Sequence, residues 1–577
     1  MIQKINVSWN NEFQHDGFLY FVQRIVEMLD YHTIDIYRAP LMNTPRLIME
    51  YLKIANGAAK SFHLDEVFHE FKDTFASDAV IQYKWGEDRI RQILDKLNRE
   101  EQNRKTTMEY LAHAIGSYYL AWAKEYALHI VVQNTKKSRI EQAIRCLVPE
   151  IIKCGYSREE IFYTARELLS DEINPSTALN DFLDHFDCKK KKFTVYFQLS
   201  QRMLQFKETL HNRLGVIFED DGSFNKLDAR EKYCVGKLEN IKAFDAVNAA
   251  NQAVEILELF TAFYQYFGDY SVPLIYKYFL VVADDGKERT VMVNRGKYTS
   301  IEGENPPQMA EIAEMVVTQL VSSARCSIAK LKQIADLHNR AISNNGLENG
   351  FLNLWSIMEM ICVSEPDKSK IDQVKNVTIP ILKRDYLPCV FKDITDNLKH
   401  IIGEEQIDQL LAEIAEKGSK HLKLACFVLL PKYNEKFDSF VDRLVQYPVL
   451  RSRLLNLHDT CTKRKNLLNL IERYGKRVSW HLYRIYRARN VITHAGKRPN
   501  DLKDIGEHLH AYVDSLAGEM IVKLSMGSLC HISNIIVDSE LQQEDIERYM
   551  KEAITLDEEC MQKIFDVQMS LWGISSK

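Results

Sequence analysis

One short segment of the chain combines side chains that could act together on a phosphate. Arg489, Asn490 and His494 follow one another closely in the stretch Arg487-Ala-Arg-Asn-Val-Ile-Thr-His494. Histidine exchanges a proton near neutral pH, and arginine forms paired hydrogen bonds with phosphate oxygens. With an amide to orient the substrate, these residues have the groups for acid–base chemistry at a phosphodiester without a metal ion.

The segment lies in the most basic part of an acidic chain. Residues 451–500 contain thirteen Lys and Arg against two acidic residues, a local charge of +11. The whole chain carries −5, so the remaining residues sum to −16. Such a contrast indicates a surface that holds a polyanion. We therefore expect four further cations to bind a phosphate backbone beside the segment: Arg484, Arg487, Lys497 and Arg498.

The segment resembles the R-x4-6-H motif of HEPN ribonucleases, in which a polar residue follows the arginine. Here the pattern is Arg489-Asn490-x3-His494. A second stretch, Phe351-Leu-Asn-Leu-Trp-Ser-Ile-Met-Glu359, is similar to the tryptophan- and glutamate-bearing helix of the Apea-like HEPN subgroup. The resemblance covers roughly residues 306–535 and does not extend to the first half of the chain.

The resemblance implies an endoribonuclease that needs no metal and no cofactor and leaves a 2′,3′-cyclic phosphate and a 5′-hydroxyl. It assigns acid–base work to His494, phosphate binding and charge stabilisation to Arg489, and substrate orientation to Asn490, with Trp355 and Glu359 as supporting residues. RNA, in some relatives tRNA, is the implied substrate. Large proteins of this arrangement resemble prokaryotic effectors of anti-phage defence, or abortive infection, which form homodimers or higher oligomers and respond to a phage-derived trigger or a partner protein.

Two other functions remain open at this stage. A HEPN-like bundle with the same basic face could recognise RNA or a nucleotide without cutting it. It could also be an interaction protein whose charge serves contact with a nucleotidyltransferase or another antitoxin. The plainer alternative for His494 is a structural histidine near the end of a helix.

Helix geometry places a condition on the motif. Five residues advance by about 500°, so Arg489 and His494 on a straight helix point roughly 140° apart and cannot share a phosphate. Arg487, seven residues before His494, lies on the same face as the histidine. Either the helix ends near Val491–Thr493, with Gly496 as the residue after its end, or two chains complete one site in a dimer.

The supporting residues also have two interpretations. Trp355 follows a helical apolar pattern and is most simply part of a core. Glu359 either pairs with Arg489 or another arginine, or is a solvated surface residue. The aromatic residues interleaved with the arginines could stack on unpaired bases or pack inward: Tyr474, Trp480, Tyr483 and Tyr486.

Periodicity predicts a mainly α-helical fold, with Gly and Pro scarce at 22 and 13 residues. The clearest strands form a hairpin, 274–283 and 288–294, around an Asp-Gly turn, with weaker strand signals at 5–9 and 33–37. We expect long amphipathic helices over these ranges: 103–132, 140–170, 192–214, 245–266, 308–343, 350–363, 404–417, 436–445, 478–494, 502–525 and 541–567.

These patterns divide the chain into four parts: a mostly helical sensor or regulatory region at 1–269, the hairpin and a linker at 270–305, the HEPN-like helical bundle at 306–535, and an acidic C-terminal helix at 536–577. The last helix is expected to pack on the bundle, with shielding of the basic site as the alternative. The four lysines at 189–192 are interpreted as a solvated connection between helices, the alternative being a nucleic-acid contact.

Composition points to a reducing cytoplasm. The eleven cysteines form no CxxC pair, so neither a zinc site nor a disulfide framework is indicated. No apolar run approaches the roughly 18 residues of a membrane span, and no signal-peptide core begins the chain. Phosphate-binding glycine loops and metalloprotease motifs are absent, and His63 and His69 lack a partner at metal spacing. We therefore expect a cytoplasmic protein without membrane contact, metal or cofactor.

Overall fold

A computed structural model supplies the structure of the protein. It describes residues 16–29, 42–57, 61–133, 136–169, 174–219, 233–267, 275–293, 298, 325–343, 346–414, 418–499, 501–525, 531–552 and 556–566. Within these residues the fold is mainly α-helical with one small antiparallel sheet, which confirms the predicted class. No helix among them is long and apolar enough to cross a membrane. The strands expected at 5–9 and 33–37 lie outside the described residues.

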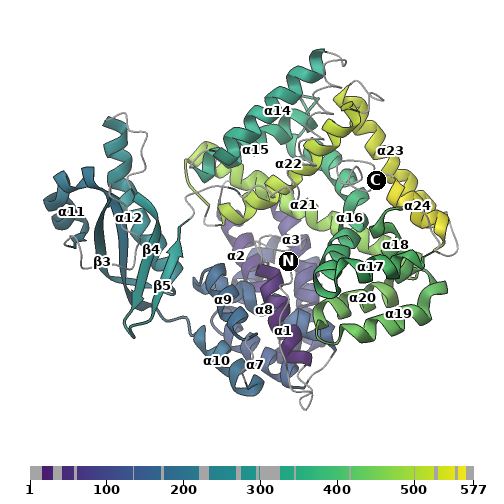
Figure 1. Cartoon of the computed structure of the whole chain (residues 1–577), viewed down its shortest axis with the longest axis horizontal. Coiled ribbons are helices and arrows are strands. Elements are labelled where there is room, and N and C mark those ends of the chain that lie inside the picture. The colour runs from purple at the N-terminus through teal and green to yellow at the C-terminus, as the bar shows by residue number, and fades with distance from the viewer. Residues whose placement is uncertain are drawn as a thin grey trace.

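The N-terminal part is a helical unit (Figure 1). Phe21, Phe71 and Tyr119 are fully buried in its core, to which Val449 of the C-terminal part also contributes. Its elements are α1 (Asp16–Leu29), α2 (Thr44–Ala55), α3 (Ser61–Ala76), α4 (Ala79–Trp85), α5 (Glu87–Arg99), the short 3₁₀ helix η1 (Glu101–Asn103), α6 (Arg104–Gly116), α7 (Tyr119–Val132), α8 (Lys137–Cys154), α9 (Arg158–Glu167) and α10 (Pro175–His185).

Two of the long helices predicted in this unit are interrupted. The range 103–132 is divided between α6 and α7 at Ser117 and Tyr118. The range 140–170 is divided between α8 and α9, because Gly155 adopts a φ of +113°, the left-handed conformation that ends a helix. Hydrophobic periodicity alone predicted that both helices would continue through these breaks.

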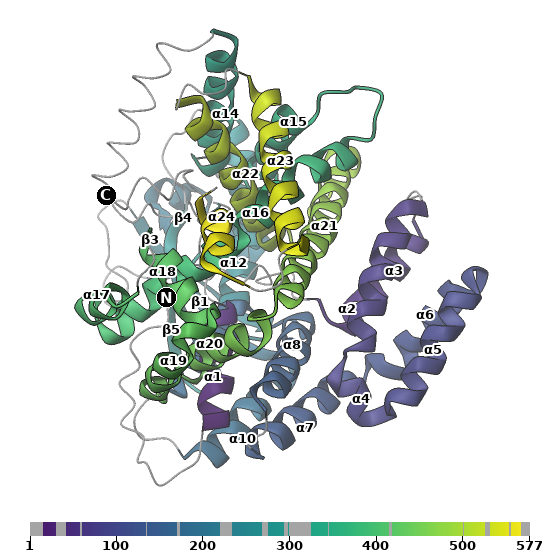
Figure 2. The same cartoon turned by 90° about the vertical axis from the view of Figure 1, so that its right-hand side faces the viewer.

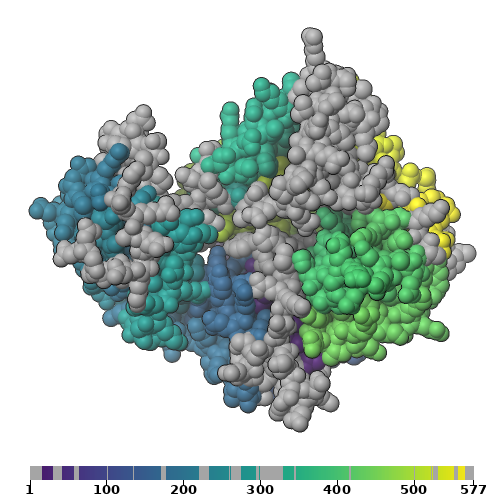
Figure 3. All heavy atoms as spheres, in the orientation of Figure 1, coloured from purple at the N-terminus to yellow at the C-terminus, as the bar shows by residue number. Residues whose placement is uncertain are grey.

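The sheet unit follows and occupies one side of the molecule (Figures 1 and 3). The antiparallel strand order is β2-β3-β1-β4-β5, and α12 packs on the sheet. The predicted hairpin is confirmed as β4 and β5, but it is the edge of a five-stranded sheet and not a separate element. The elements are β1 (Lys191–Ser200), η2 (Gln201–Phe206), α11 (Lys207–Leu214), β2 (Ile217–Phe218), β3 (Tyr233–Ala243), α12 (Ala246–Phe267), β4 (Ile275–Ala283) and β5 (Glu288–Met292).

The helix predicted over 192–214 is wrong in its first half, where the chain forms β1. Phe193, Val195, Phe197 and Leu199 alternate with other residues and are all buried in the sheet core, which is the period of a strand. β1 pairs with β3 on one side and with β4 on the other. The lysines at 191 and 192 therefore begin a strand and do not connect two helices.

Covalent and polar contacts tie the sheet unit to the N-terminal helices. Cys154, the last residue of α8, forms a disulfide with Cys188, which lies shortly before β1. Arg289 of β5 pairs with Glu160 of α9. The sequence offered no sign of this disulfide, because the two cysteines are 34 residues apart and form no motif.

The C-terminal part contains two adjoining helical cores, one centred on α15, α21 and α22 and the other on α16 and α18. Figure 2 shows α21 running beside α16 and toward the N-terminal helices. The elements are α14 (Arg325–Ser343), α15 (Leu347–Cys362), α16 (Lys370–Ile402), α17 (Glu404–Ala412), α18 (Lys420–Leu429), η3 (Pro431–Tyr433), α19 (Asn434–Val441), η4 (Asp442–Leu444), α20 (Pro448–Cys461), α21 (Arg464–Ala495), α22 (Leu502–Ser525), α23 (Ile532–Glu552) and α24 (Glu558–Asp566).

The prediction for α22 matches the structure residue for residue, whereas other boundaries differ. The expected C-terminal helix 541–567 is divided into α23 and α24, and both contribute to the core around α16. The expected helix 308–343 is represented by α14, since its first part lies outside the described residues. The 33-residue helix α16 escaped prediction, and its two internal prolines are signals that usually mark a helix end.

Candidate active site

Helix α21 holds the three residues of the motif. Its inner face is a stripe of buried side chains at spacings of three and four residues, which fixes the rotation of the helix: Leu467, Ile471, Tyr474, Val478, Leu482, Ile485, Ala488 and Ile492. Gly496 follows the helix with a φ of +58°, and its N–H donates to the carbonyl of Ile492 at 3.1 Å. The left-handed conformation of Gly496 therefore ends the helix.

The helix continues through His494 and ends at Ala495. The alternative in which it stops near Val491–Thr493 is therefore wrong, because these residues keep helical hydrogen bonding up to the left-handed Gly496. The angle of roughly 140° between Arg489 and His494 remains, and within one chain the two side chains leave the helix in different directions. His494 is exposed to solvent.

Arg489 is held by the glutamate of the second sequence segment. Its Nη2 lies 3.6 Å from Oε1 of Glu359, and the same oxygen accepts a hydrogen bond from Nε1 of Trp355 at 2.8 Å. Lys370 Nζ donates to the other Glu359 oxygen at 3.2 Å. Asn490 accepts a hydrogen bond from Arg489 Nη1 at 3.2 Å. Trp355 is buried, as its core interpretation predicted, and the expected pairing of Glu359 with Arg489 is present.

Arg484 and Arg487, by contrast, face carboxylates of the N-terminal helices. Arg484 is buried and forms ion pairs with Glu50 of α2, at 3.0 Å, and with Glu70 of α3. Arg487 also pairs with Glu50. The expectation that these two arginines lie open to a phosphate backbone is wrong for this conformation, because protein carboxylates already occupy their guanidinium groups.

The two glutamates differ in their response to burial. Burial by itself raises the pKa of Glu50, but the charges of Arg484 and Arg487 outweigh it, so the pKa lies below its ordinary value. Burial raises the pKa of Glu70 above its ordinary value, and Arg484 offsets this only in part. Glu50 is therefore the stronger anionic partner in the cluster.

The remaining predicted contacts lie beyond the end of the helix or within its core. Lys497 and Arg498 are exposed, and Arg498 lies 3.7 Å from Glu348 of α15. Tyr474 and Tyr483 are buried, so they belong to the core, and Tyr474 stacks on Tyr386. Trp480 and Tyr486 are half-buried.

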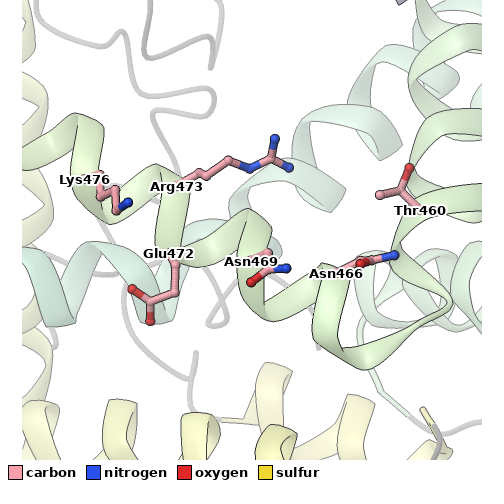
Figure 4. Close-up of a pocket in the computed structure, with 6 residues that line it drawn as sticks. All are labelled: Thr460, Asn466, Asn469, Glu472, Arg473 and Lys476. Atoms are coloured by element: carbon pink, nitrogen blue, oxygen red, sulfur yellow. The ribbon is translucent and has the colours of Figure 1, made fainter. Parts of the chain in front are cut away.

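A hollow lined by polar and charged residues opens at the opposite end of α21 (Figure 4). It has a volume of about 440 Å³, and Arg473 extends across it in the direction of Thr460. Arg473 is 21 residues before His494, a distance of roughly 31 Å along the helix. The hollow and the motif cannot bind the same phosphate. The residues that line it are Thr460, Asn466, Asn469, Glu472, Arg473 and Lys476.

Another chemical cluster escaped the sequence analysis. His338 of α14 meets His510 and Asp514 of α22, with ring and carboxylate atoms close enough to share one ligand. The four-residue spacing of His510 and Asp514 on a helix was the only local signal, since His338 is 172 residues from His510.

A comparison with family models, with curated proteins and with solved structures finds no match for this chain. The geometry of the described residues is therefore the basis for a functional assignment.

Proposed function

We propose that the protein is a metal-independent endoribonuclease of the HEPN type, with Arg489, Asn490 and His494 at its active site. The observation that supports this most is the contact of Arg489 with Glu359 and, through that carboxylate, with Trp355. These residues come from two segments about 130 positions apart, each of which resembles a HEPN pattern on its own. Their meeting at one point is what a shared active-site framework requires.

Each residue has a role that suits its surroundings. The 2′-hydroxyl of RNA attacks the neighbouring phosphorus, and the bond from phosphorus to the 5′-oxygen breaks. His494, exposed at the helix end, takes the proton of the 2′-hydroxyl or gives a proton to the leaving 5′-oxygen. Arg489, restrained by Glu359, neutralises the charge that develops on the phosphate oxygens. Asn490 orients the substrate beside Arg489. Lys497 and Arg498 extend the positive surface toward the rest of the RNA.

The continuous helix favours a site completed by two chains. Because Arg489 and His494 diverge by roughly 140° on α21, one phosphate is reached by Arg489 of one chain and His494 of another. A twofold dimer supplies two such composite sites, since every contact in a twofold interface occurs twice. A homodimer is thus part of the proposal.

The cellular role follows by analogy with proteins of this arrangement. We propose an effector of prokaryotic anti-phage defence, with RNA such as tRNA as substrate and the N-terminal region as its regulator. The support for regulation is the ion-pair cluster in which Glu50 and Glu70 of that region hold α21.

The test is an RNA-cleavage assay with excess EDTA, followed by analysis of the new RNA ends. Cleavage that continues in EDTA and leaves 2′,3′-cyclic phosphate and 5′-hydroxyl ends is the expected result. Strict dependence on Mg²⁺, or 5′-phosphate ends, would require a different mechanism and another site. RNA that binds to the protein but stays intact under all conditions would identify a binding module.

A further inference from the structure

His338, His510 and Asp514 bring three metal-ligating atoms to one point. Nε2 of His338 lies 2.9 Å from Nε2 of His510 and 3.1 Å from Oδ1 of Asp514. Nε2 of His510 lies 3.5 Å from Oδ2 of Asp514. One ligand atom from each residue can be chosen so that all three atoms lie within 4.8 Å of one another. Among the described residues, this is the one group of three such side chains that meets this distance.

The spacing of these atoms matches a tetrahedral zinc site. Zinc binds imidazole nitrogen and carboxylate oxygen at about 2.0–2.2 Å, which places neighbouring ligand atoms roughly 3.3 Å apart. The separations of 2.9 and 3.1 Å lie below this value, and the separation of 3.5 Å, which involves the other Asp514 oxygen, lies slightly above it. Two histidines that both present Nε2, together with a carboxylate, form a ligand set that zinc prefers over Mg²⁺ or Ca²⁺.

Hydrogen bonding alone leaves the cluster poorly satisfied. A neutral imidazole has one N–H, so His338 Nε2 can donate well to either His510 or Asp514 but not to both. If it donates to His510, the Asp514 carboxylate lies beside the two nitrogen atoms with no proton directed at it. A cation at the centre satisfies this carboxylate.

Secondary structure holds the ligands in place before any ion arrives. His510 and Asp514 are four residues apart on α22 and so share one face of that helix, while His338 comes from α14. His510 is only 2% exposed, whereas the side chains of His338 and Asp514 are 29% and 32% exposed. The site therefore has a rigid inner ligand and two outer ligands that solvent reaches.

We propose that His338, His510 and Asp514 form a zinc-binding site that joins α14 to α22. Three protein ligands leave a fourth tetrahedral position for water. The site is separate from the motif on α21, and this proposal does not depend on ribonuclease activity, because zinc binding is measured directly.

The experiment uses full-length protein without a histidine tag, stripped with EDTA and transferred to metal-free buffer. Zinc is then titrated in competition with a chromogenic chelator. We expect the wild type to bind one zinc ion per chain with high affinity, and His338→Ala and Asp514→Asn to bind zinc at least about 100-fold more weakly. Loss of a residue that only hydrogen-bonds to a ligand already lowers metal affinity by up to about 100-fold, and loss of the ligand itself should lower it at least as much. Six of the seven described free cysteines are buried and compete little.

Asp336→Asn is the matched control, because Asp336 is an exposed carboxylate on the same helix as His338. It should bind zinc as the wild type does. A second measurement is the melting temperature, which zinc should raise in the wild type and in Asp336→Asn but not in His338→Ala. Absence of zinc binding by the wild type, or equal binding by His338→Ala, would overturn the proposal and leave a proton-linked histidine pair as the explanation.

Discussion

The middle and the C-terminal end of α21 contain the same kinds of residue and use them differently. In the middle, Arg484 and Arg487 pair with Glu50 and Glu70 from helices more than 400 residues earlier in the chain. At the end, His494 and Lys497 are open to solvent, and Arg489 is held within its own unit by Glu359. The positively charged residues of this segment thus fall into two groups. One group attaches the N-terminal region, and the other forms the candidate catalytic surface.

Nearby anions allow the basic segment to exist in a folded protein. Neighbouring cations on one helix repel each other unless anions lie close by. In the middle of α21 these anions are glutamates of the same chain. At the end, we propose that bound RNA supplies them.

The largest expected effect concerns the open end. His494→Ala should lower RNA cleavage by about 10²–10⁴-fold, the usual contribution of a positioned proton-transfer group. Because His494 is exposed, stability should change by less than about 0.5 kcal/mol and RNA affinity should stay nearly the same. Initial cleavage rates, urea unfolding and RNA binding measure the three quantities. His113→Ala, an exposed histidine on α6, is the control, and full activity of His494→Ala would refute the assignment.

A mixing experiment tests whether the open end needs a second chain. His494→Ala and Arg489→Ala proteins should each be inactive, and an equal mixture should recover about a quarter of wild-type activity, since half of the dimers are mixed and each has one intact site. The assay is cleavage before and after subunit exchange. No recovery on mixing, or cleavage by a strictly monomeric protein, would contradict the composite site.

In the middle of the helix the expected effect is on stability. Arg484→Ala should destabilise the protein by about 3–5 kcal/mol, because it leaves the carboxylates of Glu50 and Glu70 without their buried partner. Urea unfolding followed by circular dichroism gives the value. Lys476→Ala removes an exposed cation of the same helix and should change stability by less than about 0.5 kcal/mol. If the two variants lose equal stability, the buried ion pairs of Arg484 contribute no more to folding than an exposed cation of the same helix does.

The two glutamates should respond differently to substitution and to pH. The folded-state pKa of Glu50 lies below the ordinary value of 4.5, so its stabilisation is complete above that pH and is lost as the pH falls through the folded-state pKa. The pKa of Glu70 is raised by burial, so its charge opposes folding at neutral pH. At pH 7, Glu50→Gln should therefore cost about 1–3 kcal/mol and Glu70→Gln less.

Urea unfolding at a series of pH values from neutral to below 4.5 measures this difference. The deficit of Glu50→Gln should shrink as the pH falls, because wild-type Glu50 then becomes protonated and loses the ion pairs that the variant lacks. If the stability deficit of Glu50→Gln stays constant with pH, or if the two variants lose equal stability at pH 7, the assignment of these ion pairs is wrong.

The smallest expected effect separates free from engaged cations by salt. Lys497→Ala should reduce the salt dependence of RNA binding by about one unit of slope, because one phosphate contact is lost. Arg487→Ala should leave the slope unchanged, because Glu50 already neutralises Arg487. Binding measured at several salt concentrations gives both slopes. A lower slope in the Arg487 variant would mean that RNA displaces Glu50 and reaches the middle of the helix.

Features that depend on residues close together in the chain could be predicted from the sequence. The C-terminal half of α21, the glycine that follows its end, the extent of α22 and the hairpin of β4 and β5 all follow from local periodicity and turn residues, whereas the first fourteen residues of α21 were missed. Even locally the prediction had a limit. The alternating residues of β1 were assigned to a helix, because a short apolar run is ambiguous until its strand partners, β3 and β4, are known.

Which charged side chains meet depends on contacts between residues far apart in the chain. The pairing of Arg484 with Glu50 spans 434 residues, that of Glu359 with Arg489 joins two separate helices, and His338 reaches His510 across 172 residues. Arginine interacts equally well with any accessible carboxylate or phosphate, so its residue type does not select a partner. The packing of α2, α3 and α15 against α21 makes that selection, because it brings particular carboxylates within reach and leaves His494 exposed.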